Sequence, residues 1–330
     1  MTVPSSQTVE TGHADMIHDA QLDYYGRRLA TASSDRSIRI FDVEQDNSYR
    51  LIETLRGHEG PVHGLSWAHP SFGSILASCS FDGKVFIWKE NEGPQKGWSK
   101  IKEHLLHTAS VNAIAWAPHE LGPVLACASS DGKVSVLTFN NDGTWDASLF
   151  PAHPLGVTSV TWAPAVGIGA LTSTDGHQDA AAQGVTQVKR FATGGCDGYV
   201  RLWGWKEDTK TWSPDPVQPV LEGHQDWVRD VAWAPSVGVG RAYLASAGQD
   251  KTVYIWTQDS PKSTWTNVAL EPTASSTQAP GSEGKFGDAV WRVSWSVSGN
   301  VLAVSSGDGK VSLWKENLKG KFEEVSELTS

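Results

Sequence analysis

Three side-chain types that can form a nucleophilic triad recur along this chain of 330 residues. One set comprises His58, Ser78 and Asp82, and a serine activated by a histidine–aspartate pair is a common hydrolytic nucleophile. An enzyme needs one such site, whereas His/Asp pairs recur in five repeats of this chain and the hydroxyl residue in four. We therefore interpret the sets as structural and expect a non-enzymatic protein with no catalytic residues.

The sequence also lacks the motifs of metal-binding, phosphate-binding and cysteine-pair sites. The 11 histidines show no HExxH or other metal-ligand spacing, and no GxxxxGK[ST] phosphate loop occurs. Cys79, Cys127 and Cys196 form no CxxC pair, so we interpret them as small apolar strand residues in a reducing compartment. The sequence thus predicts no metal and no cofactor.

Composition restricts the partners. With 27 basic and 37 acidic residues the net charge is -10, which argues against direct binding of nucleic acid or of anionic lipid. No apolar run approaches the roughly 20 residues of a membrane span, and the first residues lack the pattern of a secretory signal. Any membrane association is therefore expected to be peripheral, through partner proteins.

A window of thirteen residues that recurs six times organises the chain. The copies are LATASSDRSIRIF (29–41), LASCSFDGKVFIW (76–88), LACASSDGKVSVL (125–137), FATGGCDGYVRLW (191–203), LASAGQDKTVYIW (244–256) and LAVSSGDGKVSLW (302–314). Each contains a small apolar strand, a tight turn at an invariant Asp, and an alternating strand. Gly follows this Asp in four copies, because Gly tolerates the positive φ of such turns.

Two further strands flank each window, which makes four strands per repeat. The preceding strand reads VHGLSWAHP, VNAIAWAPH, VTSVTWAPA, VRDVAWAPS or VWRVSWSVS, and IHDAQLDYY is a weaker first copy. The following strand begins near an aromatic residue in every repeat: Tyr49, Trp98, Trp145, Trp212, Trp265 and Phe322. Nine of the 16 tryptophans fall at two recurrent strand positions, so we expect them in the core.

The repeats resemble the WD-repeat family of β-propellers over nearly the whole chain. The resemblance implies an all-β, six-bladed propeller in one domain, with blades at about 13–56, 57–106, 107–152, 153–222, 223–285 and 286–330. It also implies three complete structural hydrogen-bond sets: His58, Ser78, Asp82 and Trp88; His153, Thr193, Asp197 and Trp203; and His224, Ser246, Asp250 and Trp256. Blade three departs from the pattern with Cys127 and Leu137, and blade six departs with Phe286 and Val304.

Longer stretches are similar to one family of WD-repeat propellers that serves both the outer COPII vesicle coat and the Y-shaped nuclear pore complex. The similar stretches include GHEGPVHGLSWAHPSFGSILASCSFDGKVFIWKE and SGNVLAVSSGDGKVSLWKENLKGKFEE. The resemblance implies a scaffold in ER-to-Golgi transport whose partner is a large α-solenoid coat or nucleoporin subunit. It places the chain at the ER membrane surface, on COPII vesicles and at nuclear pores, with a further role in a vacuole-associated nutrient-signalling complex.

The chain ends predict an unlatched ring. After Trp314 the tail KENLKGKFEEVSELTS resembles the outer strands of other repeats, so blade six supplies its own outer strand. SQTVETG before His13 resembles an outer strand without a blade. We expect a partner to donate strands as an additional blade, in a monomeric or hetero-oligomeric assembly. The seam residues expected to receive it are Val9, Ile17, Leu22, Ile38, Ile40, Val293, Trp295 and Leu313.

Two alternatives remain open. A latch between Val9 and the C-terminal strand gives a closed adaptor that binds short peptides on its top face, and Trp227, Trp291 and Arg292 are candidates for that role. A propeller enzyme needs a non-repeated constellation that the sequence does not offer. The segments 165–190 and 272–285 are expected to be surface loops.

Overall fold

The computed structural model describes residues 8–91, 96–166, 188–235, 240–272 and 285–329, so the two predicted loops lie largely outside it. The chain divides into two compact units, Met1–Trp116 and Ala117–Ser330, and each is described by itself. The expectation of a single domain stays a prediction.

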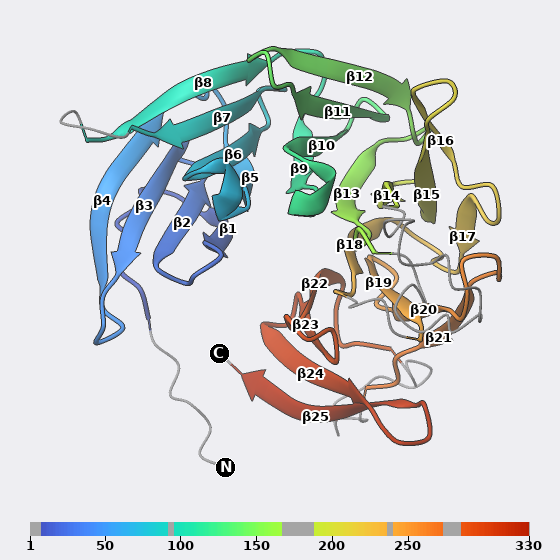
Figure 1. The fold of residues 1–330 in the computed structure, drawn as a ribbon. Helices are drawn as coiled ribbons and strands as arrows, with labels where there is room; N and C mark the ends of the chain where they lie inside the picture. The colour runs from blue at the N-terminus through green and yellow to red at the C-terminus, as the bar shows by residue number, and fades with distance from the viewer. Residues whose placement is uncertain (1–7, 92–95, 167–187, 236–239, 273–284, 330) are drawn as a thin grey trace, which may run out of the picture. The chain divides into compact units, whose positions relative to one another are not determined.

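The first unit contains two complete antiparallel sheets whose strands pair in chain order (Figure 1). The first sheet consists of β1 (Ile17–Leu22), β2 (Arg28–Ser33), β3 (Ser37–Val43) and β4 (Tyr49–Arg56). The second consists of β5 (Val62–Trp67), β6 (Ile75–Ser80), β7 (Val85–Glu90) and β8 (Trp98–His104). The short 3₁₀ turn η1 (Pro70–Phe72) separates β5 from β6, and β9 (Val111–Trp116) ends the unit.

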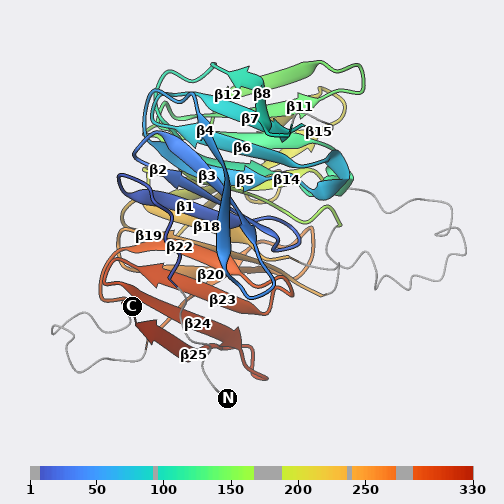
Figure 2. The same ribbon diagram turned by 90° about the vertical axis from the view of Figure 1, so that its left-hand side faces the viewer.

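The second unit continues the pattern after the 3₁₀ turn η2 (His119–Leu121). Its strands are β10 (Val124–Ser129), β11 (Lys133–Phe139), β12 (Trp145–Pro151), β13 (Val157–Trp162), β14 (Arg190–Gly195), β15 (Tyr199–Lys206), β16 (Thr211–Pro214), β17 (Val220–Glu222), β18 (Val228–Trp233), β19 (Ala242–Gly248), β20 (Val253–Gln258), β21 (Thr266–Ala269), β22 (Val290–Trp295), β23 (Val301–Ser306), β24 (Lys310–Glu316) and β25 (Phe322–Thr329). Figure 2 shows the same ribbon from the side. The described strands form six sheets, one for each predicted repeat.

One outer strand is split, which the sequence analysis did not predict. β16 and β17 both pair with β15, and the segment between them includes Pro216 and Pro219. Proline has no backbone N–H to give to a ladder, so a continuous strand cannot form there.

The hairpin turns follow from the invariant Asp. The carboxylate of Asp82 accepts the backbone N–H of Lys84 at 2.9 Å, and Gly83 between them has a φ of 79°. Arg36 and Lys251 hold the same turn position with φ values of 65° and 66°. A side chain at positive φ is strained, so these two turns form because the flanking strands fix them.

The tryptophans at the two recurrent positions form different hydrogen bonds. Trp67 at the end of β5 donates its indole N–H to the Gln21 carbonyl in the neighbouring sheet at 2.9 Å. Trp295 does the same toward the Ala232 carbonyl at 3.0 Å. Tryptophans of the other position, such as Trp88, donate within their own sheet. The first position therefore ties adjacent sheets together, and a tryptophan at the second position closes a network inside its own sheet.

Candidate functional site

The structure brings the four residues of the second-blade set together. His58 precedes β5 and places Nδ1 3.0 Å from Asp82 Oδ2 and Nε2 2.9 Å from Ser78 Oγ. The indole N–H of Trp88 on β7 donates to the same Ser78 Oγ at 2.9 Å. This series of hydrogen bonds, from the Asp82 carboxylate to the Trp88 indole, thus joins the β6–β7 turn, the interior of the sheet and the segment that enters β5.

The other two predicted sets have the same geometry. In blade four, His153 Nδ1 lies 2.8 Å from Asp197 Oδ1, and Nε2 lies 2.9 Å from Thr193 Oγ1. In blade five the corresponding distances from His224 are 3.1 Å to Asp250 Oδ1 and 2.8 Å to Ser246 Oγ. The indole N–H groups of Trp203 and Trp256 donate to these hydroxyls at 3.0 and 2.9 Å.

The carboxylates of these sets are held in the ionised form. Burial alone raises the pKa of Asp82, but hydrogen bonds from His58 and from the backbone N–H groups of Glu59 and Lys84 outweigh it and lower the pKa to about 2. The pKa of Asp250 is also about 2, because hydrogen bonds from His224, Thr252 and the backbone of Gln225 outweigh the increase that burial causes. A permanently charged aspartate fixes the orientation of each histidine.

Buried hydroxyls exclude these sets from nucleophilic catalysis. Ser78, Thr193 and Ser246 are each 0% exposed, and each hydroxyl oxygen already accepts an indole N–H. A catalytic nucleophile must reach the carbonyl carbon of a substrate, which these oxygens cannot do. The sets instead fasten the turns of each blade to its interior.

Blade one contains a further set, built on a histidine–aspartate pair that was apparent in the sequence but was not predicted as part of a complete set. His13 Nδ1 lies 2.8 Å from Asp35 Oδ2, and Nε2 lies 2.9 Å from Thr31 Oγ1. Burial raises the pKa of Asp35, but hydrogen bonds from Ser37, His13 and the Ala14 backbone outweigh this effect and hold the pKa well below its usual range. The spacing of His13 and Asp35 indicated the pair, but a complete set was not predicted because Phe41 stands at the tryptophan position.

The two blades that depart from the pattern use apolar packing or a substitute partner. In blade three Cys127 and Leu137 are fully buried, and burial raises the pKa of the Cys127 thiol to about 12. In blade six Trp314 donates its indole N–H to Ser312 at 2.8 Å, because Val304 stands at the usual hydroxyl position. The Phe286 ring lies 5.9 Å from the Trp314 ring and fills the place of the histidine.

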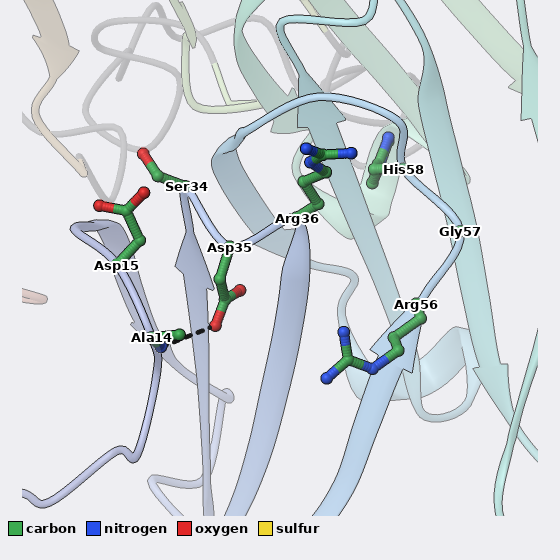
Figure 3. Close-up of a pocket in the computed structure, with 8 residues that line it drawn as sticks. All are labelled: Ala14, Asp15, Ser34, Asp35, Arg36, Arg56, Gly57 and His58. Carbon is green, nitrogen blue, oxygen red and sulfur yellow. Dashed lines mark hydrogen bonds between the residues drawn. The ribbon is translucent and has the colours of Figure 1, made fainter.

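A pocket of about 490 Å³ lies in the first unit beside the set of blade one. Figure 3 shows its lining: Ala14, Asp15, Ser34, Asp35, Arg36, Arg56, Gly57 and His58. The dashed line marks the Ala14 N–H donating to Asp35 at 3.1 Å. His58 and Asp35 are both committed to structural sets, so neither is free to act as an acid or a base in this pocket.

The first sheet has one face buried against the second sheet and one outward face. Ile38 and Ile40 are 1% and 0% exposed and pack in the cluster with residues of β5–β7, so their predicted place at the seam is wrong. The outward face carries the cross-strand row Leu22, Leu29, Phe41 and Leu51.

Both ends of this outward row are open to solvent. Leu22 is 54% exposed, Leu51 is 45% exposed, and Ile17 nearby is 45% exposed. Val9 is half-buried, and the described residues Thr8–Gly12 form no strand, which corrects the expectation of a surplus outer strand for that part. Residues 5–7 lie outside the described residues.

The last sheet requires a similar correction. Val293 and Trp295 pack in the cluster with residues of β19 and β20, so their predicted place at the seam is also wrong. Their side chains point toward the fifth sheet because they share a face with Val304 and Trp314. Leu313 lies on the opposite face, half-buried, in a row with Ala303 and Ser294. As predicted, β25 is the outer strand of this sheet, so all four strands come from 290–329.

The described residues contain neither a candidate metal cluster nor a candidate membrane-spanning helix. No group of three or more His, Cys, Asp or Glu side chains among them is placed to hold a metal ion. No helix within those ranges is long and apolar enough to cross a membrane.

Comparison with known proteins identifies the family. The WD domain, G-beta repeat family matches residues 5–42, 49–89, 98–138, 169–204, 216–257 and 281–315. Protein transport protein SEC13 of Mycosarcoma maydis is 56% identical over 98% of this chain and 95% of that protein. The chain belongs to the Sec13 family. The SEC13 protein of Cryptococcus neoformans var. neoformans serotype D (strain JEC21) is 54% identical over 98% of this chain and 97% of its own length. That of Emericella nidulans is 52% identical over 96% of both.

Membership of the Sec13 family confirms the all-β, six-bladed WD-repeat fold and the non-enzymatic class. Each of the six matched segments covers most of the two middle strands of one of the six sheets, and the relatives are named as transport proteins.

Proposed function

We propose that this Sec13-family chain is a scaffold of vesicle-mediated protein transport, as a subunit of the outer COPII coat and of the nuclear pore complex. Its sites of action are then the cytoplasmic face of the ER membrane, COPII vesicles and nuclear pores. In both assemblies an α-solenoid partner donates strands as an additional blade. The observation that carries the proposal is the last sheet, which builds all four strands from the C-terminal 290–329.

The outward face of the first sheet supports a partner blade. A propeller blade normally buries both faces against its neighbours, yet Leu22, Leu51 and Ile17 are each 45% exposed or more. Leu313 lies on the outward face of the last sheet, opposite Trp314. A donated blade covers both rows, and such an obligate interface buries roughly 2,000 Å² or more.

Rigid blades explain how a small subunit can stabilise an elongated partner. Blades such as the second are locked internally by a histidine–aspartate set, and indole–carbonyl hydrogen bonds such as that of Trp67 tie neighbouring sheets together. Close-packed sheets deform little, so strands added to them are held at a fixed angle. A membrane cage and a pore ring both need fixed angles between their subunits.

Co-expression with a candidate α-solenoid subunit tests the proposal. We expect Leu22→Glu and Leu313→Glu to reduce co-purification at least about tenfold, because each places a charge in an apolar interface. Val268→Glu on β21 is the matched control, since Val268 is 58% exposed on an outer strand and is expected to leave binding unchanged.

Limited proteolysis of the complex gives the second measurement. A short strand-forming segment of the partner is expected to be protected in the complex and cut in the free partner. Unchanged co-purification of both glutamate variants, together with no protected segment, contradicts the donated blade.

A further inference from the structure

Two exposed tryptophans of the second unit are not required by the repeat. Trp227 directly precedes β18, where other blades have residues such as Met16, Pro61 and Gly156. Trp291 is the second residue of β22. They are 44% and 48% exposed, whereas the repeated tryptophans Trp256 and Trp314 are 2% and 1% exposed. Exposing two indoles is unfavourable, so packing does not explain them.

An arginine lies between the two rings. The guanidinium carbon of Arg229 on β18 is 5.0 Å from the ring centroid of Trp227 and 4.6 Å from that of Trp291. β18 and β22 are the first strands of adjacent sheets (Figure 1). We call Trp227, Arg229 and Trp291 the Trp–Arg–Trp stack. The guanidinium is thus held by cation–π contacts with both indoles.

The neighbouring hairpin turn fixes this stack in place. Gln249 accepts the Nε–H of Arg229 at 2.7 Å, and its own backbone N–H donates to the Trp227 carbonyl at 2.8 Å. Among the described residues, the terminal nitrogens of Arg229 have no hydrogen-bond or ion-pair acceptor. A pre-organised guanidinium with free donors is the group that binds a carboxylate best.

We propose that the Trp–Arg–Trp stack binds a peptide segment of a partner protein that carries one acidic side chain flanked by apolar residues. The carboxylate accepts hydrogen bonds from the terminal nitrogens of Arg229, and the flanking residues pack on the outer faces of the two indoles. The site is separate from the outward sheet faces of the proposed scaffold function.

Nearby acidic residues favour a single carboxylate over a polyanion. Asp226 and Asp288 are exposed. The Asp288 carboxylate and the Trp291 indole nitrogen both lie against Gly307, where an added Cβ would be 2.8 and 3.0 Å from them, so Asp288 is close to the stack. These charges repel a phosphate backbone or a run of acids but leave room for one carboxylate at Arg229. The net charge of -10 has the same effect at longer range.

Binding of short peptide pools to the immobilised full-length chain tests the proposal. The probes are acetylated and amidated peptides whose central residue is Glu, Gln or Lys and whose flanking positions are mixtures of Pro, Leu, Phe and Ala. We expect the Glu pool to bind about tenfold more tightly than the Gln pool, as a charge-assisted hydrogen bond to Arg229 allows. The Lys pool is expected to bind more weakly still.

Three variants separate recognition from folding. Arg229→Gln is expected to abolish the preference for Glu over Gln, and Trp291→Ala is expected to weaken binding of both pools. Arg201→Gln is the matched control: Arg201 lies 5.8 Å from the Tyr199 ring but already pairs with Asp197 at 3.0 Å, so the preference is expected to persist.

Equal binding of the Glu and Gln pools to the wild-type chain overturns the proposal, as does a preference that survives in Arg229→Gln. Tight binding of oligothymidylate without selection among the peptide pools also overturns it, in favour of base stacking. Binding of the α-solenoid partner is expected to be unchanged in Arg229→Gln, so failure of this proposal and failure of the scaffold proposal are distinguishable.

Discussion

Replacing Ser246 with alanine tests the structural role of the histidine–aspartate sets. Ser246 Oγ lies 2.8 Å from His224 Nε2 and 2.9 Å from Trp256 Nε1, and no part of Ser246 is exposed. Removing this one oxygen leaves two buried nitrogens without a partner. A buried unsatisfied polar group costs about 1–3 kcal/mol, so we expect Ser246→Ala to lower the free energy of unfolding by about 2–6 kcal/mol.

Blade six provides the matched control for this change. Among the described residues, Ser312 Oγ accepts only the Trp314 indole N–H, at 2.8 Å, because Phe286 stands where the other blades have histidine. Ser312→Ala therefore leaves one nitrogen without a partner and is expected to cost about 1–3 kcal/mol, roughly half the effect of Ser246→Ala.

Urea unfolding followed by tryptophan fluorescence and by far-ultraviolet circular dichroism measures both changes. The double variant Ser246→Ala/Trp256→Phe is expected to lose about 1 kcal/mol less than the sum of the losses in the two single variants. The reason is that Trp256→Phe removes one of the two nitrogens that Ser246→Ala leaves without a partner. A loss below about 0.5 kcal/mol in Ser246→Ala, or equal losses in both serine variants, refutes the reasoning.

Three further outcomes follow from the turns and the sets. Asp82 and Asp250 have folded pKa values of about 2, below the usual 3.8, so the stability that they contribute is complete above about pH 4 and is lost as the pH falls toward 2. In Asp82→Asn/Asp250→Asn the urea midpoint is therefore expected to depend less on pH over this range, and an unchanged slope contradicts this. In Gly132→Ala the new Cβ would lie 2.3 Å from the His153 carbonyl oxygen at a φ of 79°, and we expect a loss above about 2 kcal/mol in the same assay, whereas wild-type stability contradicts the turn geometry. Arg36→Gly relieves a side chain at φ 65° and is expected to raise the free energy of unfolding by about 0.5–1 kcal/mol, which a decrease would rule out.

The strands and the three complete sets were predictable because they depend on local spacing. An invariant Asp after a small apolar strand specifies a hairpin wherever the fold places it. In blade one the His13–Asp35 pair was apparent, but the complete set was not predicted because Phe41 and Leu22 stand where other copies have tryptophan. The split outer strand of blade four was missed although Pro216 and Pro219 signal it.

The errors at the predicted seam have one physical origin. Period-two alternation assigns side chains to two faces of a strand, but it does not say which neighbour each face meets. In β3 both alternating sets contain large apolar residues, since Ile38 and Ile40 face the second sheet while Phe41 lies on the outward row. The sequence analysis likewise singled out Trp227 and Trp291 but not Arg229, because the contact of Arg229 with Trp291 joins different sheets.

Thiol labelling at the two outward faces tests most directly whether a partner blade completes this propeller. Leu22→Cys and Leu313→Cys are compared with Val268→Cys in the isolated chain and in the α-solenoid complex. All three changes are made in a Cys196→Ser chain, because Cys196 is half-buried whereas Cys79 and Cys127 are buried. We predict that complex formation slows labelling at positions 22 and 313 at least about tenfold and leaves position 268 unchanged. Equal labelling rates at positions 22 and 313 with and without the partner would contradict the donated blade.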